Sequence, residues 1–218
     1  MNRRHWVVLA VLCGLPAFVA AEVDSGWEKV LAQDGIEVFL RDVPGSQFRE
    51  YRGVVTVQTS LSSLVGLLED KQAAPQWIHY CRESKEVGRQ SDEAYYTYSV
   101  SSLPWPIRDR DMVMLNYFAQ DASTKVVTIR FEAAPDYLPG VKGLVRIRQL
   151  EGHWQLVPVE NHRIRVIYQL HSEPGGGIPG WLANRGVVRQ PFNTLKNLTE
   201  YVKRSEYQGL NLLHVQEP

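Results

Sequence analysis

The chain has 218 residues, with 24 basic and 24 acidic side chains, so its formal net charge at neutral pH is zero. A chain of this length favours a single domain, and with 44% hydrophobic residues it can bury a core of matching size. The balanced charge excludes the strongly basic profile that is typical of nucleic-acid-binding proteins.

Residues 1–21 have the features of a secretory signal peptide. Arg3 and Arg4 give a basic start, residues 6–15 form an apolar run too short to span a bilayer, and small residues end at Ala21. We expect cleavage before Glu22 and export to the periplasm or the cell exterior; a retained N-terminal anchor is the alternative. Cys81 would then be the only cysteine, so no intramolecular disulfide could form. We interpret it as an inert buried thiol rather than a catalytic nucleophile.

The first elements after the leader are short. Residues 24–32 form an amphipathic segment that Asp24 or Ser25 could cap as a helix. Residues 36–41 and 48–58 alternate apolar and polar side chains, which predicts two strands of a hairpin. A helix capped by Ser60 follows over 61–68, and a second short helical piece is predicted over 71–76.

Most of the remaining chain reads as strands. We predict them at 78–87, 93–103, 110–119, 125–133, 144–150, 153–159 and 163–171. Within 125–133, for example, Val127 and Ile129 alternate with Thr128 and Arg130, so one face of the strand is apolar and the other is polar and solvent-exposed. Many sequential strands at short spacing predict an antiparallel meander.

A long amphipathic helix is predicted from Pro179 to Arg204. Its apolar side chains recur at helical steps and comprise Trp181, Val188, Phe192, Leu195, Leu198 and Val202. Gly186 and Pro191 interrupt the pattern, and a proline costs about 3 kcal/mol in a helix interior. Either this is a core helix with a tolerated kink, or it is a lid with a movable first half. We predict an α+β fold in which one curved sheet wraps around this helix, with a domain over residues 22–205 and a loosely held tail over 206–218.

Few residue patterns point to catalysis. His153, His162 and His171 lie nine residues apart without an adjacent set of carboxylates, so no metal site is predicted. No Gly-x-Ser-x-Gly motif surrounds the serines at 99, 101 and 102, and no cofactor motif is present. We therefore expect a protein that is not an enzyme.

The segment 103–113, LPWPIRDRDMV, has an unusual composition. Pro104 and Pro106 force an extended connection around Trp105. The four residues 108–111 then alternate in charge where a strand begins. They are either a solvated strand end with local ion pairs, or one of them points inward, where a buried charge must be paired.

Several motifs in order resemble a START domain, the lipid-binding module of steroidogenic acute regulatory protein and its relatives. They are WEKVLAQDGIEVFLR at 27–41, PQW at 75–77, the Pro-Trp-Pro and Arg-Asp-Arg-Asp block at 104–111, the strand of Trp154, and PGGGIPGWLAN at 174–184. Together they cover residues 24 to about 204.

The resemblance implies a helix-grip fold, in which a curved antiparallel β-sheet and the long C-terminal α-helix enclose an apolar cavity. It also implies that the protein binds one phospholipid, fatty acyl lipid or sterol-like molecule and carries it between membranes, as a monomer that contacts membranes transiently and needs no cofactor. Arg110 matches the arginine that often lies inside the cavity in this family and would hold a polar headgroup. The signal peptide departs from the many cytosolic members, which puts their particular roles in doubt for this chain.

Besides Arg110, the expected ligand-binding side chains are apolar or aromatic. They are Trp77, Tyr96, Tyr98, Met112, Met114, Val127, Ile129, Phe131, Val145, Ile147, Val166 and Tyr168 from the sheet side, and Trp181, Leu182, Val188 and Phe192 from the helix. A helix-grip enzyme of the cyclase type, acting on an apolar substrate, is the alternative and would need two converging polar groups with perturbed pKa values. A secreted interaction module without a cavity is a third interpretation.

Overall fold

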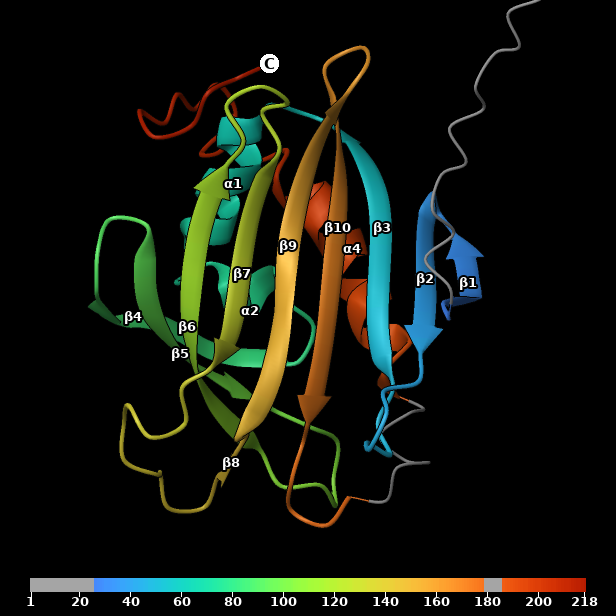
Figure 1. Cartoon of the computed structure of the whole chain (residues 1–218), viewed down its shortest axis with the longest axis vertical. Coiled ribbons are helices and arrows are strands. Elements are labelled where there is room, and N and C mark those ends of the chain that lie inside the picture. Colours follow the sequence, from blue (N-terminus) through green and yellow to red (C-terminus); the bar gives the residue numbers. More distant parts are fainter. Residues whose placement is uncertain (1–25, 179–185) are drawn as a thin grey trace, which may run out of the picture.

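The computed structural model describes residues 26–178 and 186–218, and its centre is a curved antiparallel sheet around a C-terminal helix (Figure 1). Ten strands form the sheet in the order β1-β2-β3-β10-β9-β7-β6-β5-β4, and β8 pairs in parallel with β6. Helix α4 (Arg189–Tyr201) crosses behind β10 and β3 in this view. The predicted α+β helix-grip architecture is confirmed.

The described residues up to Trp77 contain three strands and two helices. They are β1 (Glu28–Gln33), β2 (Ile36–Arg41), β3 (Glu50–Gln58), α1 (Leu61–Glu69) and α2 (Ala74–Trp77). The hairpin of β2 and β3 and the Ser60 cap agree with the sequence predictions: the Ser60 hydroxyl accepts from the Ser63 N–H at 3.1 Å.

The helical start expected around residues 24–32 is wrong. Asp34 and Gly35 both adopt positive φ angles, of 53° and 74°, and fold β1 back onto β2. A helix of one or two turns is marginal on its own, whereas the hairpin gives this segment backbone partners along its length.

The residues after Trp77 supply the remaining strands. They are β4 (Cys81–Arg89), β5 (Ala94–Ser101), β6 (Arg110–Gln120), β7 (Val127–Ala133), β8 (Val145–Arg146), β9 (Gln149–Val159) and β10 (Arg163–Glu173). The single strand predicted over 144–150 is divided. Its first part pairs with the start of β6, and its last residues open β9, which pairs with β7 and β10.

Helix α4 lies close against the concave face of the sheet. A Cβ atom at Gly53 of β3 would come within 2.7 Å of Leu195 Cδ1 and 3.2 Å of Pro191 Cβ, so the absence of a side chain permits this contact. Pro191 lies in the first turn of α4, where backbone N–H groups have no intrahelical acceptor. It therefore removes no hydrogen bond. Within the described residues the helix predicted over 179–204 begins only at Arg189, after a turn at 187–188, so Pro191 lies at the start of α4 and not at a kink within it. Residues 1–25 and 179–185, which include the predicted leader, Trp181 and Leu182, lie outside the described residues.

The C-terminal segment 206–218 is packed rather than loosely held. Tyr207 and Val215 are buried in the main core, and Leu210 and Leu212 pack against it. The Glu217 carboxylate accepts from the N–H groups of Leu61, at 3.0 Å, and Ser62, at 2.8 Å. This carboxylate satisfies two free amides at the N-terminus of α1, where the helix dipole also favours negative charge.

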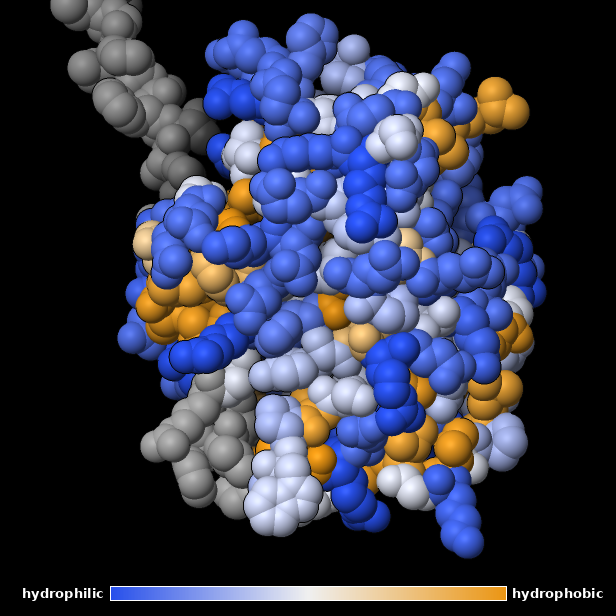
Figure 2. Space-filling model, turned by 180° about the vertical axis from the view of Figure 1, so that it is seen from behind, coloured by the Kyte–Doolittle hydropathy of each residue, from blue (hydrophilic) through white to orange (hydrophobic). Residues whose placement is uncertain are grey.

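The face on the helix side of the molecule is mostly hydrophilic, with small hydrophobic patches between the polar side chains (Figure 2). In the part of the chain that the structure describes, no helix has both the length and the apolar character needed to cross a membrane.

Candidate functional site

A cavity of about 570 Å³ lies between the concave face of the sheet, the end of α1, α2 and the first turn of α4. The connection 103–107 and the turn after β10 border it at one end. This volume falls in the range of about 300–1,000 Å³ that is usual for small-molecule sites.

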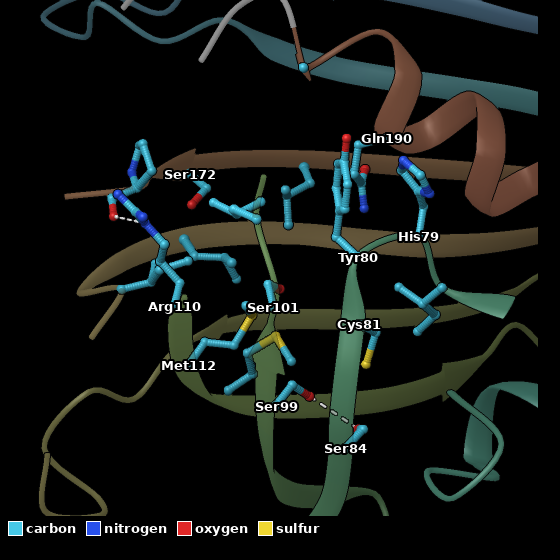
Figure 3. Close-up of a pocket in the computed structure, with 18 of the residues that line it drawn as sticks. His79, Tyr80, Cys81, Ser84, Ser99, Ser101, Arg110, Met112, Ser172 and Gln190 are labelled. Atoms are coloured by element: carbon cyan, nitrogen blue, oxygen red, sulfur yellow. Dashed lines mark hydrogen bonds between the residues drawn. The ribbon is translucent and has the colours of Figure 1, made fainter. Parts of the chain in front are cut away.

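One wall of the cavity carries a row of polar side chains. The inward-facing pairs of neighbouring strands β5 and β6 are Tyr95 with Asn116, Thr97 with Met114, Ser99 with Met112, and Ser101 with Arg110. Side chains alternate between the two faces of a strand, so every second residue of β5 meets the cavity. Figure 3 shows Ser99, Ser101 and Met112 facing the same space, and Ser99 donates to Ser84 of β4 at 3.1 Å.

The structure places Tyr96 and Tyr98 on the opposite face of β5, away from the cavity. Tyr96 stacks on Tyr137, with ring centroids 3.7 Å apart and planes 9° apart. Tyr98 packs in a second cluster with Val100 and Val113. Both faces of β5 are covered, one by the cavity and the other by the segment around Tyr137, so apolar character could not indicate which face is inside. The inward row of Tyr95, Thr97, Ser99 and Ser101 was missed for this reason.

The opposite wall is aromatic and aliphatic. Trp154 of β9 stacks on Tyr168 of β10, with centroids 3.9 Å apart and planes 2° apart, and meets Trp77 edge to face at 5.9 Å. Tyr51 of β3 contacts Tyr168 edge to face at 5.3 Å. Such a surface suits the apolar part of a ligand, because rings and chains can lie flat against its large aromatic area.

The predicted ligand-binding residues fall into four groups, the first of which, Tyr96, Tyr98 and Val145, does not line the cavity. Eight of them line the cavity: Trp77, Arg110, Met112, Met114, Ile129, Phe131, Ile147 and Tyr168. Val188 and Phe192 pack against the main core beside the cavity instead, as do Val127 and Val166, which are buried in it. Trp181 and Leu182 lie outside the described residues.

Arg110 lies at the end of the cavity bordered by the 103–107 connection and is 2% exposed. Its guanidinium donates to the carbonyl oxygens of Pro174, at 3.4 Å, Gly175, at 3.3 Å, and Arg108. In the described part of the chain no carboxylate forms an ion pair with it, since Asp109 pairs with Arg82 and Asp111 with Arg146. Burial lowers the pKa of the Arg110 guanidinium. Of the four charged residues 108–111, Arg110 therefore points inward, and no described carboxylate forms an ion pair with it.

Asp111 points to the other face of β6. Its Oδ2 accepts from Nη2 of Arg146 at 2.7 Å, and both side chains are largely buried. This contact raises the pKa of the Arg146 guanidinium. The pair fixes the parallel contact of β8 with β6 next to Arg110 and so holds this end of the cavity in place.

A second cluster of polar side chains lies where α4 meets the sheet. Burial raises the pKa of both Tyr51 and Tyr168, so their hydroxyls stay protonated at neutral pH. The Tyr51 hydroxyl and the side-chain oxygen of Gln190 are buried and form no hydrogen bond of good geometry to a described residue. Gln190 and His79 both border the cavity (Figure 3), and burial lowers the pKa of His79. These groups can donate or accept hydrogen bonds with a ligand while remaining uncharged.

Cys81 also borders the cavity. Burial raises the pKa of its thiol to about 11, so the nucleophilic thiolate is scarce at neutral pH. Among residues 26–178 and 186–218, no group of three or more His, Cys, Asp or Glu side chains is arranged to hold a metal ion.

Comparisons with known proteins agree with this geometry. A family model described as the START domain matches residues 19–208. The chain is 36% identical over 195 residues to an uncharacterised protein of Pseudomonas aeruginosa. The alignment covers 89% of this chain and 94% of that protein. It is 26% identical over 191 residues to the phosphatidylcholine transfer protein of Mus musculus, covering 85% of this chain and 86% of the mouse protein.

Two solved structures are also similar. The crystal structure of a STAR-related lipid transfer protein fragment from Xanthomonas axonopodis is 40% identical, with a TM-score of 0.77, and covers 82% of this chain and 99% of the fragment. Human StAR-related lipid transfer protein 5 is 16% identical, with a TM-score of 0.75 over 84% of this chain and 88% of that chain, which shows a shared fold.

Proposed function

The chain belongs to the START domain family, and from this premise we propose that it binds one lipid in its cavity and carries it between membranes. The observation that supports the proposal most is the cavity itself: an aromatic and aliphatic wall faces a polar row that ends at a buried guanidinium without a carboxylate partner among the described residues. A phospholipid, a fatty acyl lipid or a sterol-like molecule combines the required apolar body with a polar group.

The apolar wall provides the driving force. Burying a 16-carbon chain is worth on the order of 12 kcal/mol at about 0.8 kcal/mol per methylene. Ordering the chain and losing translational freedom offset much of this gain. In this proposal the apolar part of the lipid contacts Trp77, Met112, Met114, Ile129, Phe131, Ile147 and Tyr168.

Arg110 anchors the polar group of the lipid. A buried cation is costly unless it is paired, and backbone carbonyls provide only partial charges. An anionic headgroup would supply the missing charge, and a hydroxyl could accept a hydrogen bond from the same guanidinium.

Trp105 is the proposed membrane contact. Its side chain is 93% exposed although it borders the cavity, and Arg108 beside it is also exposed. Tryptophan prefers the boundary between lipid and water, and an arginine favours anionic lipid headgroups. A monomer could therefore place this end of the cavity on a bilayer surface while a lipid enters or leaves.

Binding rather than catalysis is favoured by the protonation of the cavity groups. The raised pKa values of Tyr51, Tyr168 and Cys81 leave these groups protonated at neutral pH, so none of the three supplies a base or a nucleophile.

Export to the periplasm or the cell exterior completes the proposal. It rests on the basic start, apolar run and small residues of the first 21 positions. The mass of the mature protein, recovered from its native compartment, should correspond to a chain that begins at Glu22; a full-length chain in the cytosol would refute export.

Transfer of a fluorescent phospholipid between two vesicle populations tests the function. We expect catalytic amounts of the protein to accelerate transfer, and Ser99→Phe to abolish it by filling the space opposite the aromatic wall. Thr56→Phe places the same ring on an exposed position of β3 and should transfer normally. Failure of the wild-type protein to bind or transfer any lipid tested would overturn the proposal.

A further inference from the structure

A second cation lines the cavity, at the end away from Arg110. Lys71 follows α1 directly and borders the cavity together with Leu68, Tyr95 and Asn116. We call this group the inner end. Three of its members, Leu68, Tyr95 and Asn116, are buried, whereas Trp105 at the other end is almost fully exposed.

The two cations lie at opposite ends of one strand pair. Arg110 of β6 pairs with Ser101, and Asn116 of the same strand pairs with Tyr95. Asn116 lies six positions after Arg110 on the strand, which is roughly 20 Å at about 3.3 Å per residue. The polar row of β5 joins the two ends.

The Lys71 ammonium has spare capacity for a ligand. Its Nζ donates to the carbonyl oxygen of Leu68 at 2.5 Å and to the Tyr95 hydroxyl at 3.4 Å, and it lies 5.0 Å from the centroid of the Tyr95 ring. A lysine ammonium has three N–H donors, so one remains without an acceptor in the described part of the chain.

Nearby carboxylates are engaged elsewhere. Glu69 contacts His214 at 3.1 Å, and Asp70 accepts from the Ala73 N–H and the Tyr207 hydroxyl. Glu86 is paired with Arg89 at 2.7 Å. Among the described residues none of these carboxylates lies within ion-pair distance of Lys71.

Burial of this amine has a measurable consequence. It lowers the pKa of Lys71 to about 8, because the charged form loses water, and the charges of Glu69, Glu86 and Asp70 offset this loss only in part. An anion bound beside the amine would restore the stability of the charged form.

We infer that the inner end is a second polar subsite, in which Lys71 binds an anionic oxygen of the ligand, so that the ligand carries polar groups at both ends of its apolar body. This inference rests on the proposed lipid-binding function. It adds the chemistry of the ligand group that lies at the inner end of the cavity. The oxygen can belong to a carboxylate or a phosphate, since one free N–H and a point charge fit either.

A pair of probes separates the two ends. Hexadecanoate offers one carboxylate, whereas hexadecanedioate offers one at each end of the same chain. We expect the wild-type protein to bind the diacid more tightly. Lys71→Met should weaken diacid binding about tenfold or more, as loss of a charged hydrogen bond does, while changing hexadecanoate binding less than twofold. A third probe, hexadecanoate with a terminal phosphate, distinguishes a phosphate subsite from a carboxylate one by its relative affinity.

Two further variants distinguish a binding role from a structural one. Lys71→Arg keeps the cation and should retain most of the preference for the diacid. Lys85→Met removes an exposed lysine on the outer face of β4 and should change nothing. Equal weakening of both probes by Lys71→Met, with a lowered melting temperature, would show that Lys71 only caps α1 and would overturn the inference, as would equal wild-type affinity for the two probes. If hexadecanoate itself does not bind, the proposed function fails instead.

Discussion

The Arg110 side chain donates from Nη2 to the carbonyl oxygen of Gly175 at 3.3 Å, which ties the first residue of β6 to the turn that follows β10. A second bond, from Nε to Pro174, strengthens this link. Arg110 thus holds the border of the cavity in shape and also presents a positive charge to its interior. Both functions must be separated when the residue is replaced.

Replacing Arg110 should weaken binding of an anionic lipid. We expect Arg110→Leu to lower affinity for phosphatidic acid about tenfold or more, because a charge-assisted hydrogen bond contributes about 1.5–3 kcal/mol. Arg110→Lys should recover part of the loss. Affinity for diacylglycerol, which lacks the charge, reports the structural part of the effect, and Arg165→Leu, at an exposed position of β10, is the control. Equal losses for the two lipids would show that Arg110 only supports the turn.

The buried pair of Asp111 and Arg146 should carry much of the stability near β8. Removing one member of a buried pair leaves the other charge uncompensated, so Arg146→Ala should lower the free energy of unfolding by about 3–5 kcal/mol. Arg148→Ala removes an exposed pair with Asp136 and should cost less than about 1 kcal/mol. Urea denaturation measures both. Similar costs for the two variants would contradict the assigned difference in burial.

The hydrogen bonds between the Glu217 carboxylate and the N-terminus of α1 should contribute measurably to thermal stability. Glu217→Ala removes the acceptor of two helix N-terminal amides and should cost about 1 kcal/mol, as loss of a helix cap does. Glu206→Ala, beside an exposed contact with Arg204, is the control and should stay within about 0.5 kcal/mol of wild type. An unchanged melting temperature for Glu217→Ala would show that the contact of its carboxylate with α1 adds nothing to stability.

Trp105 should govern membrane association. We expect Trp105→Ala to reduce cosedimentation with anionic vesicles several-fold, because the interfacial indole is lost. Leu213 is another fully exposed apolar residue, on the C-terminal segment, and Leu213→Ala should sediment as the wild type does. Loss of sedimentation in both variants, or in neither, would argue against a specific role for the 103–107 connection.

The stability of the unliganded protein should depend on Lys71 at alkaline pH. The folded pKa, about 8, lies below the ordinary value of 10.5. Between these values the unfolded chain binds more protons, so stability rises with pH across this interval. The free energy of unfolding of the wild type should therefore increase relative to Lys71→Met between pH 8 and 10.5, and the difference should be constant below pH 7. The charged groups that act on Lys71 are present in both proteins: Glu69, Asp70, Glu86 and Arg89. A flat difference would contradict the lowered pKa.

The sequence predicted most strands, and it narrowed the inward-pointing charge to residues 108–111, because those features are local. Strand β2 was predicted at Ile36–Arg41, as observed, since strict alternation and the Asp34-Gly35 turn fix both its face and its start. The inward cation was predictable only as one of the residues 108–111 from charge alternation. Its assignment to Arg110 came from the resemblance, and its burial agrees with that assignment.

Other features depend on contacts distant in sequence. The inner face of β5 could not be chosen because the covering segment around Tyr137 lies some 40 residues away along the chain. Lys71 gave no signal as a cavity residue, since its contact with Tyr95 joins residues 24 apart. The packing of Glu217 on α1 joins residues 156 apart, which no local pattern encodes.

Native mass spectrometry of the purified full-length chain and its processed form tests the central claim most directly. Wild-type protein should carry one lipid per chain, and Ser99→Phe should carry none, while Thr56→Phe retains it. Extraction should then identify a ligand with an apolar body and at least one polar end. Repeated absence of bound lipid from the wild-type protein, together with no uptake of any lipid by the delipidated chain, would contradict the account.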